Sequence, residues 1–556
     1  MFTQDFSAVG GSLGWSALIA VIPILYFIWA LMFKKMKGYI AGITTLLVAL
    51  VLAVVAFKMP VGTAVMAASQ GAMYGIIPIG WIIVTSVFLY NVTVRTGQFD
   101  IIRYSVLSIT ADRRVQALLV AFSFGAFLEG AAGFGAPVAI SAALLVGLGF
   151  NPLYAAGLCM IANTAPVAFG AIGIPITAME GPTGIPALEI SKMVGRQLPF
   201  LSVCIPFLLV WIMVGWKKTI EVLPAILVSG ITFAVTQYLS SNFLGPELPD
   251  VLSALVSLLA LAIFMKFWTP KEIYRFADEK LNVEDQVNQY YSGGQIFKAW
   301  SPFIILTAFI SLWGIPTIKS ALIGHYEGTN VVLSWINQLG SWLTFTPAVP
   351  FVNNQIIDGM TNAPIAAVYK IEILGAAGTA IFLAAIVTKF IFNVSWKNWW
   401  SILGQTANEI KFPLLTICAV VAYAYVVNAA GMTTTLGLIL AKTGVLFPFF
   451  SPVLGWIGVF ITGSDTSANV LFAKLQQVTA TSVGMDPVLA LAANSSGGVT
   501  GKMISPQSIA VAAAAVGLMG REAELLRFTI KYSIILLLAI CILTFLQSNV
   551  LSFMIP

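Results

Sequence analysis

Charged residues are scarce in this sequence. Asp, Glu, Lys and Arg make up only 9% of the 556 residues, whereas hydrophobic residues make up 59%. Soluble globular domains are about 25% charged, so the composition excludes an ordinary soluble protein. The sequence instead contains apolar runs near 20 residues, and runs of this length can cross a bilayer as helices. Ten-residue segments of alternating polarity are absent, which argues against a membrane β-barrel.

Residues that bind metals, cofactors or nucleotides are also few. The chain has one histidine, His325, and four cysteines without metal-binding spacing. It contains no G-x-x-x-x-G-K-[ST] loop, which argues against ATP-driven import, and no H-E-x-x-H motif. The net charge is +6, and the basic residues cluster in short loops, as they do in inside-facing loops of membrane proteins. This charge therefore requires no nucleic-acid partner. We therefore expect an all-α polytopic membrane protein with no cofactor, no metal and no enzymatic activity.

Basic loops orient the expected membrane spans. The segments 34–37 and 95–114 are placed in the cytoplasm, because inside-facing loops are enriched in Lys and Arg. Spans near 219–240 and 251–268 are then joined by an acidic outside loop, GPELPD at 245–250. About 12 to 14 spans are expected, since each needs roughly 20 residues.

A polar stretch divides the chain almost in half. We predict an N-terminal membrane half at 1–268, a cytoplasmic linker at 269–298 and a C-terminal membrane half at 299–556. Each half is expected to hold one broken-helix repeat, at about 117–178 and about 449–519.

The two repeats match in their later parts. FNPLYAAGL (150–158) resembles MDPVLALAA (485–493), and NTAPVAFGAIGIP (163–175) resembles NSSGGVTGKMISP (494–506). Asn, Gly and Pro fall at the same offsets in the second pair of segments. An acid flanked by small residues lies upstream of the matched segments in each repeat, 23 residues before the proline of FNP and 22 before that of MDP. Chance matching in a chain rich in Gly, Ala and Pro is the alternative.

The first of these acids, Glu129, lies in an apolar run from 117 to 149 that is too long for one crossing. Its surroundings, FLEGAAGFGAP, predict a re-entrant hairpin or two half-helices, because irregular backbone at membrane depth needs protein or a water-filled cavity beside it. Half-helix N-termini at such a tip suit an anion. A carboxyl group at this depth indicates function, so Glu129 is predicted to carry a proton. A structural pair with a buried lysine is the alternative.

The acid of the second repeat is Asp465, in FITGSDTSANV at 460–470. Its hydroxyl and amide neighbours can bind a carboxylate or a cation, or can simply satisfy helix carbonyls. We predict Glu129 and Asp465 as proton-coupling residues. The predicted substrate-binding residues are Gly130, Gly133, Gly135, Asn163, Thr164, Ser464, Thr466, Ser467, Asn469, Asn494, Ser495, Ser496 and Lys502, the last of which also balances charge.

Three segments closely resemble the bacterial lactate permease family: FSFGAFLEGAAGFGAPVAISAALLVGLGF (122–150), MIANTAPVAFGAIGIP (160–175) and GSDTSANVLFAKLQ (463–476). The resemblance covers the whole chain, including its length and polar linker. It implies uptake of L-lactate, with D-lactate and glycolate as further substrates, driven by a proton across the bacterial cell membrane. A more distant resemblance to the ion-transporter superfamily implies paired inverted hairpins, a transport domain that moves against a scaffold, and often a homodimer.

Together these features predict a proton-coupled symporter for small 2-hydroxymonocarboxylates such as lactate. A sodium-coupled carboxylate carrier stays open, because Asp465 and its hydroxyl neighbours would offer Na⁺ the oxygen ligands that hard cations prefer. A passive anion channel also stays open, since broken helices line channels as well as carriers.

Overall fold

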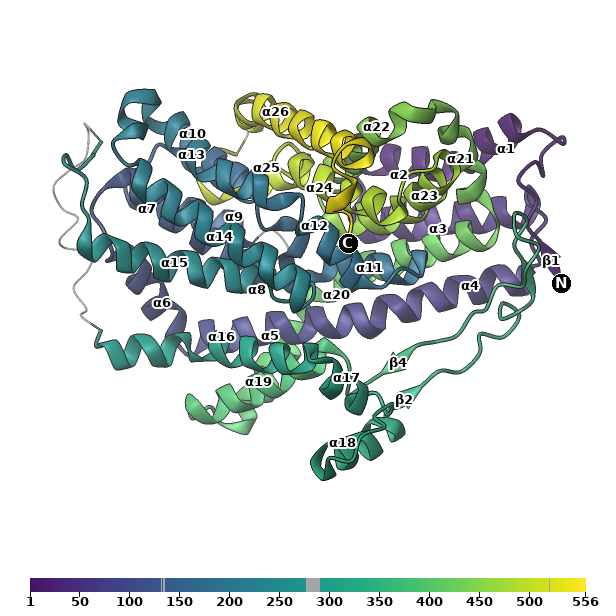
Figure 1. Cartoon of the computed structure of the whole chain (residues 1–556), viewed down its shortest axis with the longest axis horizontal. Coiled ribbons are helices and arrows are strands. Elements are labelled where there is room, and N and C mark those ends of the chain that lie inside the picture. Colours follow the sequence, from purple (N-terminus) through teal and green to yellow (C-terminus); the bar gives the residue numbers. More distant parts are fainter. Residues whose placement is uncertain (132, 134–135, 277–290, 520) are drawn as a thin grey trace.

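The structure is a computed structural model, and almost all of its regular secondary structure is helical (Figure 1). It describes residues 1–131, 133, 136–276, 291–519 and 521–556. Two short strand pairs are present there: β1 (Phe2–Thr3) runs parallel to β3 (Ile356–Ile357), and β2 (Thr344–Phe345) is antiparallel to β4 (Ile371–Glu372). The predicted all-α membrane fold is confirmed.

Eleven helical segments of the described chain are long and apolar enough to cross a membrane, and one bent pair brings the number to twelve. This number reaches the lower end of the predicted range. The helices before the first repeat are α1 (Leu13–Ala20), α2 (Ile22–Met32), α3 (Gly38–Val55), α4 (Val61–Tyr74), η1 (Gly75–Gly80), α5 (Trp81–Arg95) and α6 (Gln98–Leu107).

Eleven further helical elements of the described chain lie between the repeats, and two follow the second repeat. Those between the repeats are α12 (Ala187–Val194), α13 (Leu198–Ile220), α14 (Leu223–Phe243), α15 (Pro249–Phe267), α16 (Gly293–Gly314), α17 (Pro316–Leu322), α18 (Val331–Trp342), α19 (Ala377–Ile391), α20 (Trp396–Ala429) and α21 (Met432–Leu440), the last continued by η5 (Ala441–Leu446). Those after it are α26 (Glu522–Asn549) and η6 (Ser552–Met554).

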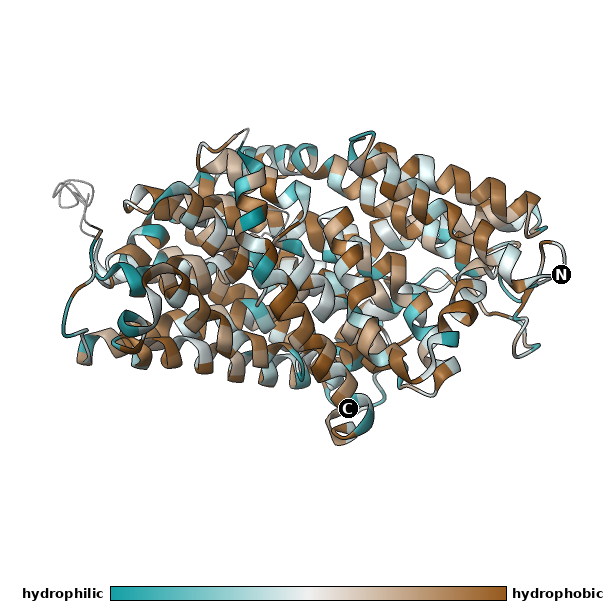
Figure 2. Cartoon of the chain, turned by 90° about the horizontal axis from the view of Figure 1, so that it is seen from above, coloured by the Kyte–Doolittle hydropathy of each residue, from teal (hydrophilic) through white to brown (hydrophobic). Residues whose placement is uncertain are grey.

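Large apolar side chains cover much of the outer surface. Figure 2 shows hydrophobic residues along most of the outer helices. Leu47, Val51, Leu259 and Ile535 are each more than half exposed. Soluble proteins rarely expose so much apolar surface to water, because its hydration is unfavourable. Lipid chains are themselves apolar, so this surface faces the bilayer.

The first repeat forms a hairpin followed by a bent helix pair. Its elements are α7 (Arg113–Ala117), η2 (Leu118–Phe124), α8 (Gly125–Ala131), α9 (Ala136–Gly147), α10 (Pro152–Ala162), η3 (Val167–Phe169) and α11 (Gly170–Thr183). α9 packs back against η2 and α8, so the run from 117 to 149 is a helical hairpin as predicted. The chain then bends by 64° between α10 and the segment Val167–Thr183.

The second repeat contains a hairpin and a broken helix pair in the same order. Its elements are α22 (Phe447–Thr462), α23 (Asp465–Val483), α24 (Pro487–Lys502) and α25 (Pro506–Ala515). Both hairpin tips contain a glycine with left-handed backbone, Gly133 with φ of 56° and Gly463 with φ of 69°. The two acids differ in their placement, however, because Glu129 precedes its tip whereas Asp465 follows its own.

Matching caps explain the sequence similarity between the repeats. Asn151 caps α10 by accepting a hydrogen bond from the backbone N–H of Leu153, and Asp486 caps α24 in the same way. A proline follows each cap, where its missing N–H costs nothing and its fixed φ suits a helix start. The Asn-Pro and Asp-Pro pairs are therefore equivalent helix starts. α11 packs against α23 (Figure 1), and η3 packs against α24, so the two repeats are in contact.

Close packing of α24 on α22 depends on glycine. A side chain at Gly497 would overlap the backbone carbonyl of Pro452 in α22. We expect Gly497→Ala to destabilise the protein by about 1–3 kcal/mol, because overpacking against rigid backbone forces helices apart. The measurement is thermal unfolding of the detergent-solubilised protein. Gly404→Ala is the control, since its added methyl group meets no atom within 4 Å; equal melting temperatures for both variants would contradict the expectation.

Candidate functional site

Glu129 and Lys502 form a buried ion pair that joins the two repeats. The Nζ atom of Lys502 lies 2.8 Å from Oε1 of Glu129, and the two side chains are 13% and 4% exposed. Glu129 lies in α8 and Lys502 is the last residue of α24. The other carboxylate oxygen, Oε2, is buried and has no hydrogen-bond partner among the described residues. Lys502 therefore balances the charge of Glu129, while one oxygen of the pair stays unsatisfied.

An irregular segment at the start of α11 supports this pair. Ala171, Ile172 and Gly173 have consecutive positive φ values of 45°, 58° and 72°. A β-branched residue in this region is an outlier, and such positions cost roughly 1–3 kcal/mol each. The preceding residue, Gly170, lies directly against Glu129, since a Cβ atom there would be 2.8 Å from Oε1. The bend thus brings backbone close to the carboxylate, an approach that a larger residue at position 170 would block.

Asp465 is held by side chains of the second repeat. Its Oδ2 atom accepts hydrogen bonds from Asn469 at 3.0 Å and from the hydroxyl of Ser495 at 2.7 Å. Its Oδ1 atom is buried without a partner among the described residues. The charges of Glu129 and Lys502 both act on Asp465, so the three groups share one electrostatic environment.

A chain of amide side chains extends from Asp465. Asn469 donates to the backbone carbonyl of Pro175 at 3.1 Å, which ties the second repeat to the first. Asn494 donates to Asn469 at 2.9 Å, and Gln476 donates to Asn494 at 3.1 Å. Sequence reasoning did not select Gln476, although Asp465, Asn469 and Gln476 follow a helical spacing that places them on one face of α23.

The other predicted residues of the first repeat lie around the same pair. Asn163 and Thr164 are buried just after α10, and the side-chain amide nitrogen of Asn163 and hydroxyl of Thr164 have no partner in the described part of the chain. Gly130 allows α15 to approach, and Gly133 packs against Ala171. Gly135 lies outside the described residues.

The remaining predicted residues of the second repeat line the start of α23 and the middle of α24. Ser464 caps α23 and accepts a hydrogen bond from the backbone N–H of Ser467 at 3.2 Å. Thr466 and Ser467 are buried in the first turn. The hydroxyl of Ser496 is buried and lacks a partner among the described residues.

The space beside Lys502 is small. Asn163, Lys502 and Ser508 contribute to the lining of a cavity of about 20 Å³, which suffices for roughly one water molecule. A hydroxyacid is larger than water, so it fits there only if the surrounding elements move apart.

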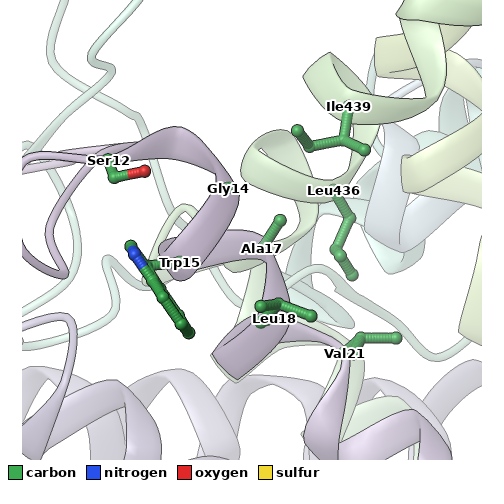
Figure 3. A pocket seen from close by; sticks show the side chains of 8 residues that line it. All are labelled: Ser12, Gly14, Trp15, Ala17, Leu18, Val21, Leu436 and Ile439. Carbon is green, nitrogen blue, oxygen red and sulfur yellow. The ribbon is translucent and has the colours of Figure 1, made fainter.

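Two larger cavities among the described residues lie away from the buried acids. One, of about 540 Å³, lies between α1 and α21 and is lined by apolar side chains apart from Ser12 (Figure 3). The other, of about 510 Å³, has apolar lining residues together with charged ones such as Glu180, Lys370 and Lys474, for which it is named the polar cavity. Glu180 is near the C-terminal end of α11, whose N-terminal end contacts Glu129, so this polar cavity lies one helix away from the ion pair.

A third carboxylate of the site was missed. Asp250 was expected in an outside loop, but it lies in the first turn of α15 and is fully buried. A Cβ atom on Gly130 would lie 2.8 Å from the Cβ of Asp250, so the acid packs directly against the residue after Glu129. The loop GPELPD carries no sign of this contact, because it arises between helices distant in sequence.

Known proteins of one family match this chain over nearly its full length. The family model described as L-lactate permease matches residues 16–551. The L-lactate permease of Bacillus subtilis is 68% identical, with 100% of each chain covered. Glycolate permease GlcA of Escherichia coli is 51% identical over 99% of this chain and 98% of its own. The L-lactate permease of Escherichia coli is 49% identical over the full length of both chains.

A solved structure, the YdaH transporter of Alcanivorax borkumensis, aligns with 81% of this chain and 87% of its own, at 14% identity and a TM-score of 0.33. The full-length match and the membrane-crossing helices make this chain a multi-pass protein of the bacterial cell membrane. The chain belongs to the L-lactate permease family, which is a family of transporters and not of enzymes.

Proposed function

We propose that this protein is a secondary transporter that imports L-lactate, and also D-lactate and glycolate, together with one proton. Relatives named for lactate and for glycolate, matched over nearly their full lengths, support this substrate class. The observation that carries the coupling proposal is the buried Glu129–Lys502 ion pair between the two broken segments.

The substrate carboxylate would compete with Glu129 for the ammonium group of Lys502. Among the described residues, Lys502 is the only lysine or arginine within ion-pair distance of Glu129. When the substrate takes Lys502, Glu129 loses its partner inside a buried site. An unpaired buried carboxylate costs several kcal/mol, so Glu129 then takes up a proton. Anion and proton therefore enter the site together.

Neutral polar groups would bind the rest of the substrate. The side chains of Asn163, Thr164 and Ser496 are buried with unsatisfied atoms, and buried polar groups normally find partners. The hydroxyl group of a 2-hydroxyacid can serve as the hydrogen-bond partner of such an atom, because it both donates and accepts hydrogen bonds. A site built to satisfy a hydroxyl group discriminates strongly against an analogue that lacks it.

Movement of the repeats would admit the substrate. The polar cavity lined by Glu180, Lys370 and Lys474 would serve as a vestibule, since α11 leads from it to Glu129. We also propose a homodimer, on the resemblance to the ion-transporter superfamily, which light scattering of the purified protein tests.

Transport by this scheme is expected to be electroneutral. An empty site contains the neutral Glu129–Lys502 pair, and a loaded site adds one anion and one proton. In proteoliposomes, an inward proton gradient should drive labelled lactate uptake, while a potassium-valinomycin potential should leave the initial rate unchanged within about twofold, since no net charge moves. Excess glycolate should compete and succinate should not.

One ion replacement and one accumulation measurement test the alternatives. If uptake ceased when choline replaced sodium, the cation would be Na⁺ and Asp465 its ligand. If labelled lactate only equilibrated across the membrane despite the proton gradient, the protein would be a passive channel.

A further inference from the structure

Asp250 stands apart from the other acids of the site because it belongs to neither repeat. It lies in α15, which packs against α8 and α11 of the first repeat. Its side chain is 0% exposed. Both of its carboxylate oxygens are buried without a hydrogen-bond partner among the described residues.

An ionised carboxylate in these surroundings would be an uncompensated buried charge. Fully buried acids are rare unless they are paired, since the loss of hydration costs several kcal/mol. The titratable groups that act on Asp250 are Glu129 on α8 and Lys502 on α24. They are already paired with each other, and thus offer Asp250 no free positive charge.

We propose that Asp250 delivers the transported proton to Glu129. This inference rests on the proposed symport. While Glu129 is paired with Lys502, Asp250 carries the proton. When the substrate carboxylate takes Lys502, Glu129 is released from the ion pair and turns toward Asp250; the O–H bond of Asp250 then breaks as an O–H bond forms on Glu129. Asp250 then regains a proton from water, so one proton is taken up for each substrate anion.

Asp250 packs beside the residue that follows Glu129, but the two carboxyl groups are not hydrogen-bonded to each other while the ion pair is intact, so the transfer waits for the release of Glu129. Glu129 directs Oε1 at Lys502, and its second oxygen, Oε2, is the buried atom left without a partner. Asp250 packs against Gly130, the next residue along the chain, where the absence of a side chain permits the approach. The proton thus reaches Glu129 from α15, whereas the substrate binds among the repeat residues beside Lys502. Separate routes let both ligands arrive without displacing each other.

The test compares rate with final accumulation. Asp250→Asn keeps the shape of the side chain but can neither release nor accept a proton as the acid does. In proteoliposomes with an imposed proton gradient, we expect net lactate uptake to slow about 100-fold or more, in line with the typical effect of a positioned proton donor. The final accumulation should be that of wild type, because Glu129 still couples substrate to proton. Exchange of internal for external lactate should keep its rate and its KM, since it needs no net proton movement.

Three controls make the outcome decisive. Asp250→Glu should restore at least part of the net rate, and Asp100→Asn, an exposed acid in α6, should leave transport unchanged. Net uptake at the wild-type rate in Asp250→Asn would overturn the proposal. Equal loss of exchange and net uptake in protein that elutes normally in size exclusion would also overturn it, because Asp250 would then shape the binding site. Failure of the proposed symport is a separate result: wild type itself would show no uptake driven by the proton gradient.

Discussion

Lys502→Met is expected to abolish lactate transport in both net-uptake and exchange assays. The substitution retains much of the side-chain volume and removes the ammonium group that holds Glu129 at 2.8 Å and would hold the substrate carboxylate. Removing one partner of a buried ion pair costs roughly 3–5 kcal/mol. A loss of this size in substrate binding corresponds to about 100-fold or more in affinity. The measurement is the initial rate of labelled lactate exchange in proteoliposomes across a range of concentrations.

Two further variants show whether binding or folding is lost. Lys442→Met removes an exposed lysine from η5 of the same half of the chain and should transport as wild type does. The double variant E129Q/K502M removes both charges, leaves no unpaired ion, and should therefore be folded yet inactive. Exchange at the wild-type rate in Lys502→Met would show that the substrate anion is held elsewhere.

Glu129→Gln is expected to separate exchange from accumulation. The amide cannot neutralise Lys502, so the empty site contains an unpaired buried ammonium group. Such a site cannot change its orientation without substrate, since the uncompensated charge is costly to bury. Net uptake driven by a proton gradient should fall to background. Exchange should continue, because the substrate anion itself neutralises Lys502, and its KM should fall since no carboxylate competes.

This result differs from the one expected for Asp250→Asn, in which only the rate of net uptake falls. Glu189→Gln is a matched control, because it removes an acid from a surface pair with Lys192 in α12, where the glutamate side chain is 37% exposed. Net uptake at the full rate in Glu129→Gln, with the pH dependence of wild type, would remove Glu129 from the coupling mechanism.

Local sequence patterns predicted the broken segments well. The apolar run around Glu129 was too long for one crossing, and it forms the hairpin of η2, α8 and α9. The Asn-Pro and Asp-Pro pairs marked the starts of α10 and α24 because helix caps are read from neighbouring residues. The division into halves at 268 and 299 stays a prediction.

Pairings across the chain were harder to predict. Lys502 lay near Asp465 in sequence, and either acid was a plausible partner. It pairs with Glu129, which is 373 residues away, because the end of α24 meets the end of α8. Gln476 had a local signal in its helical spacing from Asp465, whereas Asp250 had none.

The sequence by itself determined that this chain lies in a membrane, that helices are interrupted in two of its segments, and that an acidic residue lies near each interruption. These properties follow from composition and from short-range backbone preferences, which neighbouring residues set. Only the tertiary structure decided that Lys502 balances Glu129, that Asn469 reaches the carbonyl of Pro175, and that Asp250 joins the site. Those contacts depend on how helices distant in sequence pack together. Glycines such as Gly130 and Gly170 indicate in the sequence that another part of the chain approaches closely, but they do not identify the residue that does so.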